Sequence, residues 1–208
     1  MFEKFDQTSY HQLCDLLGGH HPDLQLILDR YGYPPFWSRS NTFESLVHII
    51  LEQQVSLASA LAAMNKLKEK IDEVTPARVL LLTDQELREC YFSRQKTAYV
   101  RHLAENIVSG ALSLTRMEEM DDLTIRCQLK SIKGIGDWTV DIYLIFMLHH
   151  LDVFPIGDLA AVNSLKKVKG LSAGVSREEV ISEASQFKPY RTIATMLLWH
   201  AYLSERNR

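Results

Sequence analysis

The sequence has few cysteines, no long apolar run and no excess of positive charge. Its three cysteines, Cys14, Cys90 and Cys127, are too scattered for a disulfide framework or a metal cluster, so we expect reduced thiols in a cytosolic protein. No run of about 18 apolar residues is present, and the acidic-polar start of the chain lacks the apolar core of a signal peptide. We therefore expect neither a membrane span nor secretion.

The charge balance also argues against a protein that coats nucleic acid. The formal net charge at pH 7 is −3, whereas nonspecific nucleic-acid binders carry a strongly basic surface. Any DNA binding by this chain must therefore come from a local surface.

Alternating apolar and polar residues, the pattern of a β-strand, are missing as well. Apolar residues recur instead at helical spacing, in about nine to eleven segments. Capping residues mark several expected helix starts, at Pro22, Asn41–Glu44, Ser56, Thr83–Glu86, Ser93, Asp121, Ser176–Glu179 and Pro189. With 46% apolar and 24% charged residues, the sequence predicts a soluble all-α protein.

Residues 129–158 hold the most informative pattern. A short helix ends near residue 132, and the turn Gly134-Ile135-Gly136 connects it to an apolar helix over about residues 137–149. The two glycines allow a tight turn that a side chain would hinder. We expect the main-chain N–H groups of this turn to face outward, with the positive end of the next helix dipole behind them. This arrangement is typical of a phosphate site.

The fuller pattern is Leu129, Ile132, Gly134, Ile135, Gly136 and Thr139, followed by the apolar helix. It is typical of a helix-hairpin-helix over about residues 123–149, which grips the DNA backbone without reading the sequence. Main-chain amides do this work, so few positive side chains are needed, and Lys133 adds one phosphate contact. The alternative is a simple connection between two helices.

Asp158 follows Pro155-Ile156-Gly157 at the start of another expected helix. Aspartate is a common helix N-cap, and Asp158 alone would carry no further meaning. It lies 22 residues after Gly136, however. This order and spacing resemble the helix-hairpin-helix DNA glycosylases, whose catalytic aspartate follows the hairpin through such a loop.

The resemblance covers about residues 22–203 and is similar in detail to the 3-methyladenine DNA glycosylase II branch. It implies two all-α lobes with an active-site cleft between them. The central lobe would span residues 39–149, and residues 1–38 with 150–208 would form the second lobe, which carries Asp158. The similar blocks are FESLVHIILEQQVSLAS at 43–59, SRQKTAYVRHLA at 93–104, SIKGIGDWTVDIYL at 131–144, DVFPIGDLA at 152–160 and FKPYRTIATMLLWHAY at 187–202.

The resemblance also implies a base pocket. Trp138 and Trp199 match positions that line the pocket in the alkylation-repair branch, where an indole face attracts a cationic purine with about 0.5–2 kcal/mol. Core packing is the alternative for both. Phe36 and Trp37 belong to an aromatic segment that either packs on the core or forms a pocket wall. Tyr143 adjoins a position where some relatives have a pocket tyrosine, which leaves the substrate range open.

Gln54 matches the wedge that fills the space left by a flipped base. It lies with Gln53 and Val55 between two apolar helices, and Ser56 caps the second one. An exposed corner without a role is the alternative. The expected DNA-binding residues are Gln54, Ser56, Lys133, Gly134, Ile135, Gly136 and Thr139.

Two absences decide the expected chemistry. Bifunctional relatives have a Schiff-base lysine two places after the second hairpin glycine, where this chain has Trp138, so we expect no strand cleavage. Relatives with an iron–sulfur cluster need four cysteines near the C-terminus, and none follows Cys127. The pairs His20-His21 and His149-His150 lack metal-ligand spacing and are expected at the surface or at helix ends. No cofactor or metal is expected.

These expectations converge on a monofunctional DNA glycosylase of base-excision repair. Its substrates would be alkylated, cationic purines such as 3-methyladenine and 7-methylguanine in double-stranded DNA. We expect a monomer in the bacterial cytoplasm, at the nucleoid, or in a eukaryotic nucleus. The alternatives are a non-catalytic helix-hairpin-helix module that binds bent or damaged DNA, and a helical protein-interaction scaffold, which leaves the hairpin unexplained.

Overall fold

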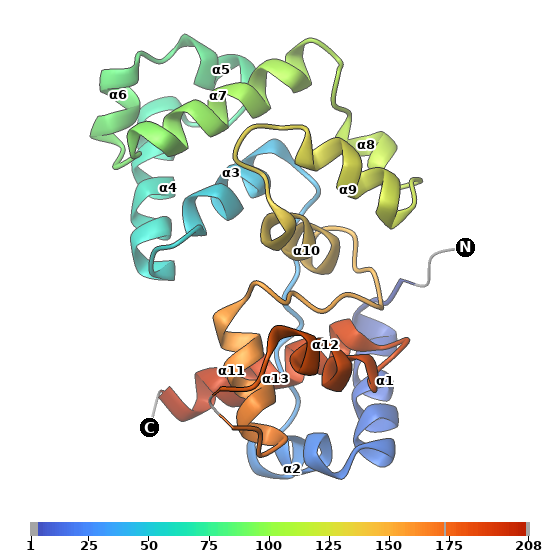
Figure 1. The fold of residues 1–208 in the computed structure, drawn as a ribbon. Helices are drawn as coiled ribbons and strands as arrows, with labels where there is room; N and C mark the ends of the chain where they lie inside the picture. Colours follow the sequence, from blue (N-terminus) through green and yellow to red (C-terminus); the bar gives the residue numbers. More distant parts are fainter. Residues whose placement is uncertain (1–3, 173, 207–208) are drawn as a thin grey trace. The chain divides into compact units, whose positions relative to one another are not determined.

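The computed structural model describes residues 4–172 and 174–206, and this part of the chain is built from helices (Figure 1). An isolated antiparallel bridge between Lys4 and His150 is the only β pairing within it. The predicted all-α class is confirmed. None of the helices in the described part has the length and apolar character needed to cross a bilayer.

The described residues form 13 helices, and the expected number of nine to eleven was too low. The difference lies in helices of four to six residues, which are too short to show a periodic pattern. The helices missed are α5 (Pro76–Leu81) and α8 (Leu114–Met117), whereas α6 (Asp84–Glu89) begins at the predicted capping residues Thr83 and Glu86.

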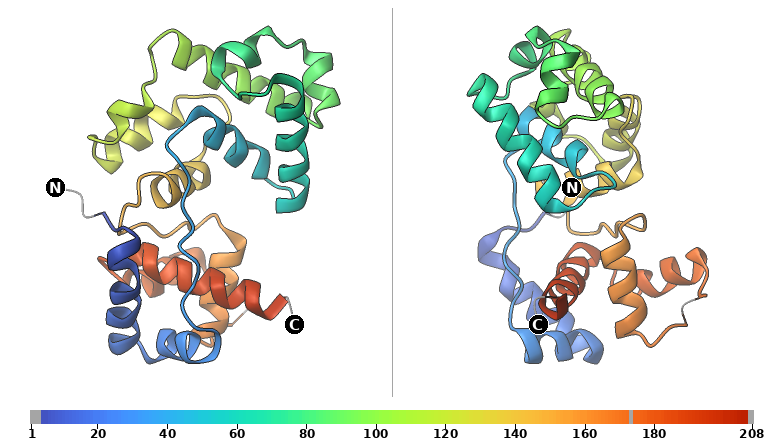
Figure 2. Two further views of the ribbon diagram at one scale, coloured as in Figure 1. Left: turned by 180° about the vertical axis from the view of Figure 1, so that it is seen from behind. Right: turned by 90° about the vertical axis from the view of Figure 1, so that its left-hand side faces the viewer.

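The chain divides into two compact units by its contacts. The terminal unit comprises Met1–Ser38 and Leu144–Arg208, and the internal unit comprises Arg39–Tyr143. The division falls inside α10 (Asp137–Phe146), earlier than the expected position between residues 149 and 150. Figure 2 shows both units from two further sides.

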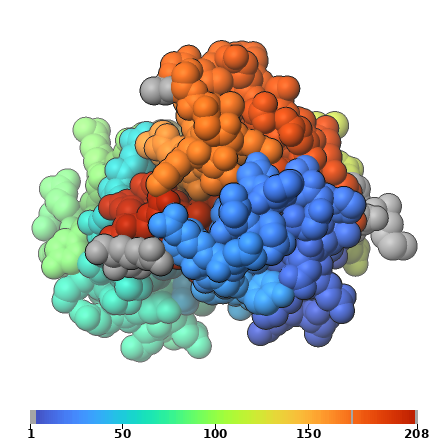
Figure 3. Space-filling model, turned by 90° about the horizontal axis from the view of Figure 1, so that it is seen from below, coloured from blue at the N-terminus to red at the C-terminus, as the bar shows by residue number. Residues whose placement is uncertain are grey.

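The terminal unit is organised around α13 (Arg191–Arg206), in which every residue from Thr192 to Trp199 is buried. A helix that is buried on all sides over such a stretch has other helices packed around it. It packs against α1 (Gln7–His20), α2 (Pro22–Tyr31) and α11 (Leu159–Val168), and α12 (Arg177–Ser185) packs on α11. Figure 3 shows one face of this unit, with α1 and α2 in blue and the segment that contains α11 in orange.

The internal unit is built on α3 (Phe43–Glu52), whose apolar residues are buried against α4 (Leu57–Ile71) and α7 (Arg94–Val108). The short helices α5 and α6 pack on α7, and α9 (Asp122–Lys130) leads into the hairpin. Thr42, Ser56, Ser93 and Asp121 each cap a helix by accepting a main-chain N–H three residues later, which explains where these helices begin.

Three predicted helix starts and ends need correction. The partner of the Thr42 cap is Ser45, so Asn41–Glu44 is not a capping box with Glu44. The helix expected to reach His149 ends at Phe146, because the chain turns away and His149 takes a left-handed φ of 53°. The last helix begins at Arg191, two residues after the expected Pro189.

Candidate functional site

Asp158 lies at the start of α11 in the terminal unit and is held from two helices. Its Oδ1 accepts the main-chain N–H of Ala161 at 2.9 Å, which is the N-cap bond. The same oxygen accepts the indole Nε1–H of Trp199 on α13, also at 2.9 Å. Both donors present partial positive charge to the carboxylate, and the N-terminus of α11 adds its dipole. The half-buried carboxylate is therefore fixed in direction and surrounded by groups that favour negative charge.

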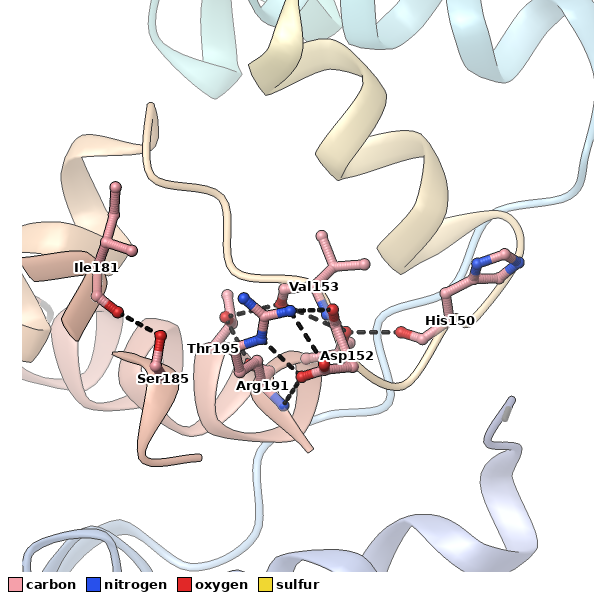
Figure 4. Close-up of polar contacts among 8 residues, drawn as sticks. His150, Asp152, Val153, Ile181, Ser185, Arg191 and Thr195 are labelled. Carbon is pink, nitrogen blue, oxygen red and sulfur yellow. Dashed lines mark hydrogen bonds and ion pairs between the residues drawn. The ribbon is translucent and has the colours of Figure 1, made fainter. Parts of the chain in front are cut away.

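The connector over residues 150–157 leads to Asp158 and is clamped by the first turn of α13. Arg191 donates to both carboxylate oxygens of Asp152, at 2.6 Å and 2.9 Å, and to its main-chain oxygen at 3.0 Å (Figure 4). The buried Oγ1 of Thr192 donates to the carbonyl of His150 at 2.6 Å and accepts the N–H of Val153 at 3.0 Å. Thus α13 holds the connector at its first turn and Asp158 about two turns later.

Trp199 belongs to an aromatic cluster next to Asp158. Its ring lies edge-on to Trp37, with centroids 6.4 Å apart, and tilted against Phe146 at 5.4 Å. The structure thus brings Asp158, Trp199 and Trp37 together. Phe146 was missed by sequence reasoning because it lies in the apolar run of α10, where hydrophobicity does not separate a site residue from a core residue.

The other aromatic residues of the predicted pocket lie elsewhere. Phe36 packs with Phe5, Tyr10 and His149 in the terminal unit. For Phe36 the alternative of core packing, and not a pocket wall, therefore holds. Tyr143 is fully buried, and its hydroxyl donates to Asn41 Oδ1 at 2.9 Å; burial raises the pKa of this phenol. Tyr143 is thus a core residue of the internal unit. Trp138 is half-buried in the first turn of α10, in the internal unit.

The hairpin in the internal unit needs its two glycines for different reasons. Gly134 has a left-handed φ of 88°, and a Cβ there would overlap the ring of Tyr99. At Gly136 a Cβ would meet no atom within 4 Å. The fold itself therefore requires Gly134, whereas Gly136 leaves space in front of the turn for a ligand.

The main-chain N–H groups of the hairpin are only partly available. The N–H of Lys133 donates to His102 Nδ1 at 2.9 Å, and that of Ile135 donates to the carbonyl of Ile132 at 3.1 Å. For the N–H groups of Gly134 and Gly136 no acceptor is found within residues 4–172 and 174–206. The outward amides expected at this turn are therefore those of Gly134 and Gly136.

Side-chain charges near the hairpin suit an anion. Lys133 is exposed. Asp137, which would repel a phosphate at the start of α10, is paired with Lys130 at 2.6 Å. The net charge of the whole chain is thus a poor guide to this local surface.

The turn between α3 and α4 lies against the hairpin. Gln54 is exposed, with a left-handed φ of 57°, and Ser56 caps α4 through Ser59 N–H at 3.1 Å. Gln53 Nε2 donates to the carbonyl of Gly134 and to Thr139 Oγ1, both at 2.9 Å. Thr139 is almost fully buried, so its hydroxyl serves this internal contact. Sequence reasoning noted the polar pair between apolar helices but assigned a role only to Gln54.

The remaining candidates are the histidines and cysteines. Within the described ranges no group of three or more His, Cys, Asp or Glu side chains is arranged to hold a metal ion. His150 is buried, so of the two expected positions, the surface or a helix end, the surface is ruled out for this residue. All three cysteines are free, as predicted, and burial raises the pKa of the Cys14 thiol to about 12.

Known proteins resemble this chain over most of its length. Residues 47–189 match the family model described as HhH-GPD superfamily base excision DNA repair protein. The alkylbase DNA glycosidase-like protein mag2 of Schizosaccharomyces pombe is 33% identical over 162 residues, which is 76% of each chain. The 3-methyladenine DNA glycosylase Mag1 of the same yeast, solved with abasic DNA, has a TM-score of 0.83 at 28% identity and covers 90% of this chain and 95% of its own. A DNA-3-methyladenine glycosidase of Bacillus halodurans has a TM-score of 0.78 at 27% identity, covering 100% and 95%.

Proposed function

Because this chain belongs to the HhH-GPD superfamily of base excision DNA repair proteins, we propose that it is a monofunctional glycosylase for alkylated purines. Membership of this family makes the protein a DNA glycosylase that binds DNA and acts in base excision repair. Relatives named for 3-methyladenine support the alkylated substrate. The observation that carries the proposal is the carboxylate of Asp158, fixed by a helix N-terminus and an indole N–H beside an aromatic cluster.

Asp158 acts on the sugar of the damaged nucleotide. When the N-glycosidic bond breaks, its electron pair leaves with the base, and positive charge develops on the sugar. A carboxylate fixed before the reaction stabilises this charge without reorganisation, and electrostatic stabilisation of this kind supplies most of the rate enhancement in many enzymes. Water then adds to the sugar and loses a proton, to Asp158 or to solvent, which leaves a free base and an abasic site.

The aromatic rings near Asp158 select the base. An alkylated purine such as 3-methyladenine or 7-methylguanine is cationic, and an indole face attracts it by about 0.5–2 kcal/mol. Trp199 and the half-buried Trp37 supply such rings in the terminal unit. Trp138 belongs to the internal unit, and its part in base selection is a proposal from its position in the sequence alone. A cationic base is also a good leaving group, so the protein does not need to protonate it.

Trp138 bears on whether the DNA strand is cut after base release, and the hairpin on how the DNA backbone is bound. No lysine stands at the Schiff-base position, so the abasic strand stays intact. The amides of Gly134 and Gly136, with Lys133, hold a phosphate next to the lesion, and Gln54 fills the space left by the flipped base. The reaction is a hydrolysis that requires no cofactor. We propose that one copy of the chain suffices, in the bacterial nucleoid or the eukaryotic nucleus.

One experiment tests this function. The protein is incubated with duplex DNA methylated by an alkylating agent, and the released bases are identified by mass spectrometry. Release of 3-methyladenine or 7-methylguanine by the wild type, and not by Asp158→Asn, is the expected result. Tight binding to damaged duplex without release of any base would favour the second candidate, a non-catalytic damage-binding module.

A further inference from the structure

Gln53 joins the turn between α3 and α4 to the hairpin. Its side-chain amide uses both N–H groups, one on the carbonyl of Gly134 and one on Thr139 Oγ1, at 2.9 Å each. Glutamine alone among similar side chains meets this geometry. Asparagine is one methylene shorter, and glutamate has no hydrogen to offer a carbonyl oxygen. The contact thus depends on the residue type and not only on side-chain volume.

The main-chain hydrogen bonds of the turn that carries Gln53 are long. At the end of α3 the N–H of Gln53 donates to the carbonyl of Ile50 at 3.3 Å. The N–H of Val55 donates to the carbonyl of Glu52 at 3.5 Å. Lys96 Nζ donates to the carbonyl of Leu51 at 2.6 Å, which fixes the end of α3 itself. The two bonds from Gln53 therefore link the turn directly to the phosphate-facing loop.

We propose that Gln53 is a positioning residue that holds the Gln54 wedge at a fixed place relative to the phosphate clamp. Adjacent Cα atoms are about 3.8 Å apart, so the position of Gln54 follows that of Gln53. Gly134, which accepts the bond, belongs to the loop whose amides grip the phosphate. Gripping the backbone therefore also aligns the wedge with the base step beside it. This inference rests on the proposed role of Gln54 in damaged DNA.

The test separates alignment of the wedge from stability of the hairpin. Gln53→Met keeps the length of the side chain and removes its donors, and Thr139→Val removes one acceptor from the other side. Gln85→Met, the same change at an exposed site of the internal unit, is the control. Binding is measured by fluorescence anisotropy on an undamaged duplex and on one with a tetrahydrofuran abasic analogue. 2-Aminopurine opposite the analogue reports insertion of the wedge.

Gln53→Met should bind the abasic duplex about tenfold more weakly, as expected for the loss of net hydrogen bonding. It should also lose the 2-aminopurine signal and bind the undamaged duplex as the wild type does. Combined with Gln54→Ala, it should weaken binding no further than Gln54→Ala alone, because it acts through the wedge. Thr139→Val should behave in the same way, which keeps the test available if Gln53→Met does not fold.

Several results would overturn this role. Equal weakening on both duplexes, or full additivity with Gln54→Ala, would mean that Gln53 only stabilises the hairpin. The positioning role of Gln53 would also be excluded if both variants bound both duplexes as the wild type does. The same holds if the wild-type protein did not prefer the abasic duplex. Base release from methylated DNA is measured separately. If the wild type releases no base but the binding pattern is as expected, the proposed catalysis fails and the positioning role stands.

Discussion

Trp199 has two chemical features that the structure allows to be tested apart. Its Nε1–H donates to Asp158 at 2.9 Å, and its ring packs beside Trp37 and Phe146. Trp199→Phe removes the donor and keeps an aromatic face, whereas Trp199→Leu removes both. The first substitution should therefore act on the carboxylate alone, and the second on the carboxylate and on the attraction for a cationic base.

The expected magnitudes follow from these contacts. A hydrogen bond to a charged group contributes about 1.5–3 kcal/mol, so Trp199→Phe should slow base release about 10- to 150-fold. The loss should be the same for cationic 7-methylguanine and for neutral hypoxanthine, because it concerns the sugar and not the base. Trp199→Leu should lose a further 0.5–2 kcal/mol, about two- to thirtyfold, on 7-methylguanine only.

Single-turnover excision of both bases by the three proteins provides the assay, with circular dichroism as the check on folding. Wild-type rates for Trp199→Phe would refute the role of the indole N–H. Equal losses of Trp199→Leu on both bases would mean that the ring acts by shape or packing. Selectivity would then come from the intrinsic lability of the alkylated bond.

Three further outcomes are expected. Asp158→Asn should keep the fold, since asparagine also caps helices, but lose at least about a hundredfold in base release. Asp121→Asn, the same change at another N-cap, should release bases at the wild-type rate. Near-normal turnover by Asp158→Asn would remove the carboxylate from the mechanism. Borohydride should trap no protein–DNA adduct because Trp138 replaces the Schiff-base lysine, and a trapped adduct or strand breaks without alkali would contradict monofunctional chemistry. Gly136→Ala should melt like the wild type but bind duplexes of every sequence more weakly. Gly134→Ala should lower the melting temperature because its Cβ overlaps the ring of Tyr99. Normal duplex binding by a folded Gly136→Ala would place the phosphate-binding site elsewhere.

The sequence predicted the all-helical class, the hairpin and the N-cap position of Asp158 because each depends on local signals. Glycines at a turn, a cap residue and helical periodicity act within a few residues of one another. The number of helices was less accurate, since a helix of four to six residues contains too little of the pattern.

Contacts between distant segments were out of reach of the sequence. Nothing in the residues around Trp199 indicates that its N–H, and not only its face, serves Asp158. The bond from Gln53 to Gly134 joins residues 81 positions apart. Sequence reasoning also treated aromatic residues as equivalent pocket candidates, whereas packing places Tyr143 in a core and Phe36 in a separate cluster. Such distinctions arise from tertiary packing and have no local signal.

The way the two units are threaded has a consequence for synthesis of the protein. The internal unit is one continuous segment, and the terminal unit is assembled from both sides of it, with α13 as its last helix. Domains generally fold as units during translation, starting with those that emerge first. We therefore expect the hairpin to fold on the ribosome while the helix that supports Asp158 is still being made. We expect a translation product that stops before α13 to retain the hairpin but to lack the helix whose Trp199 supports Asp158.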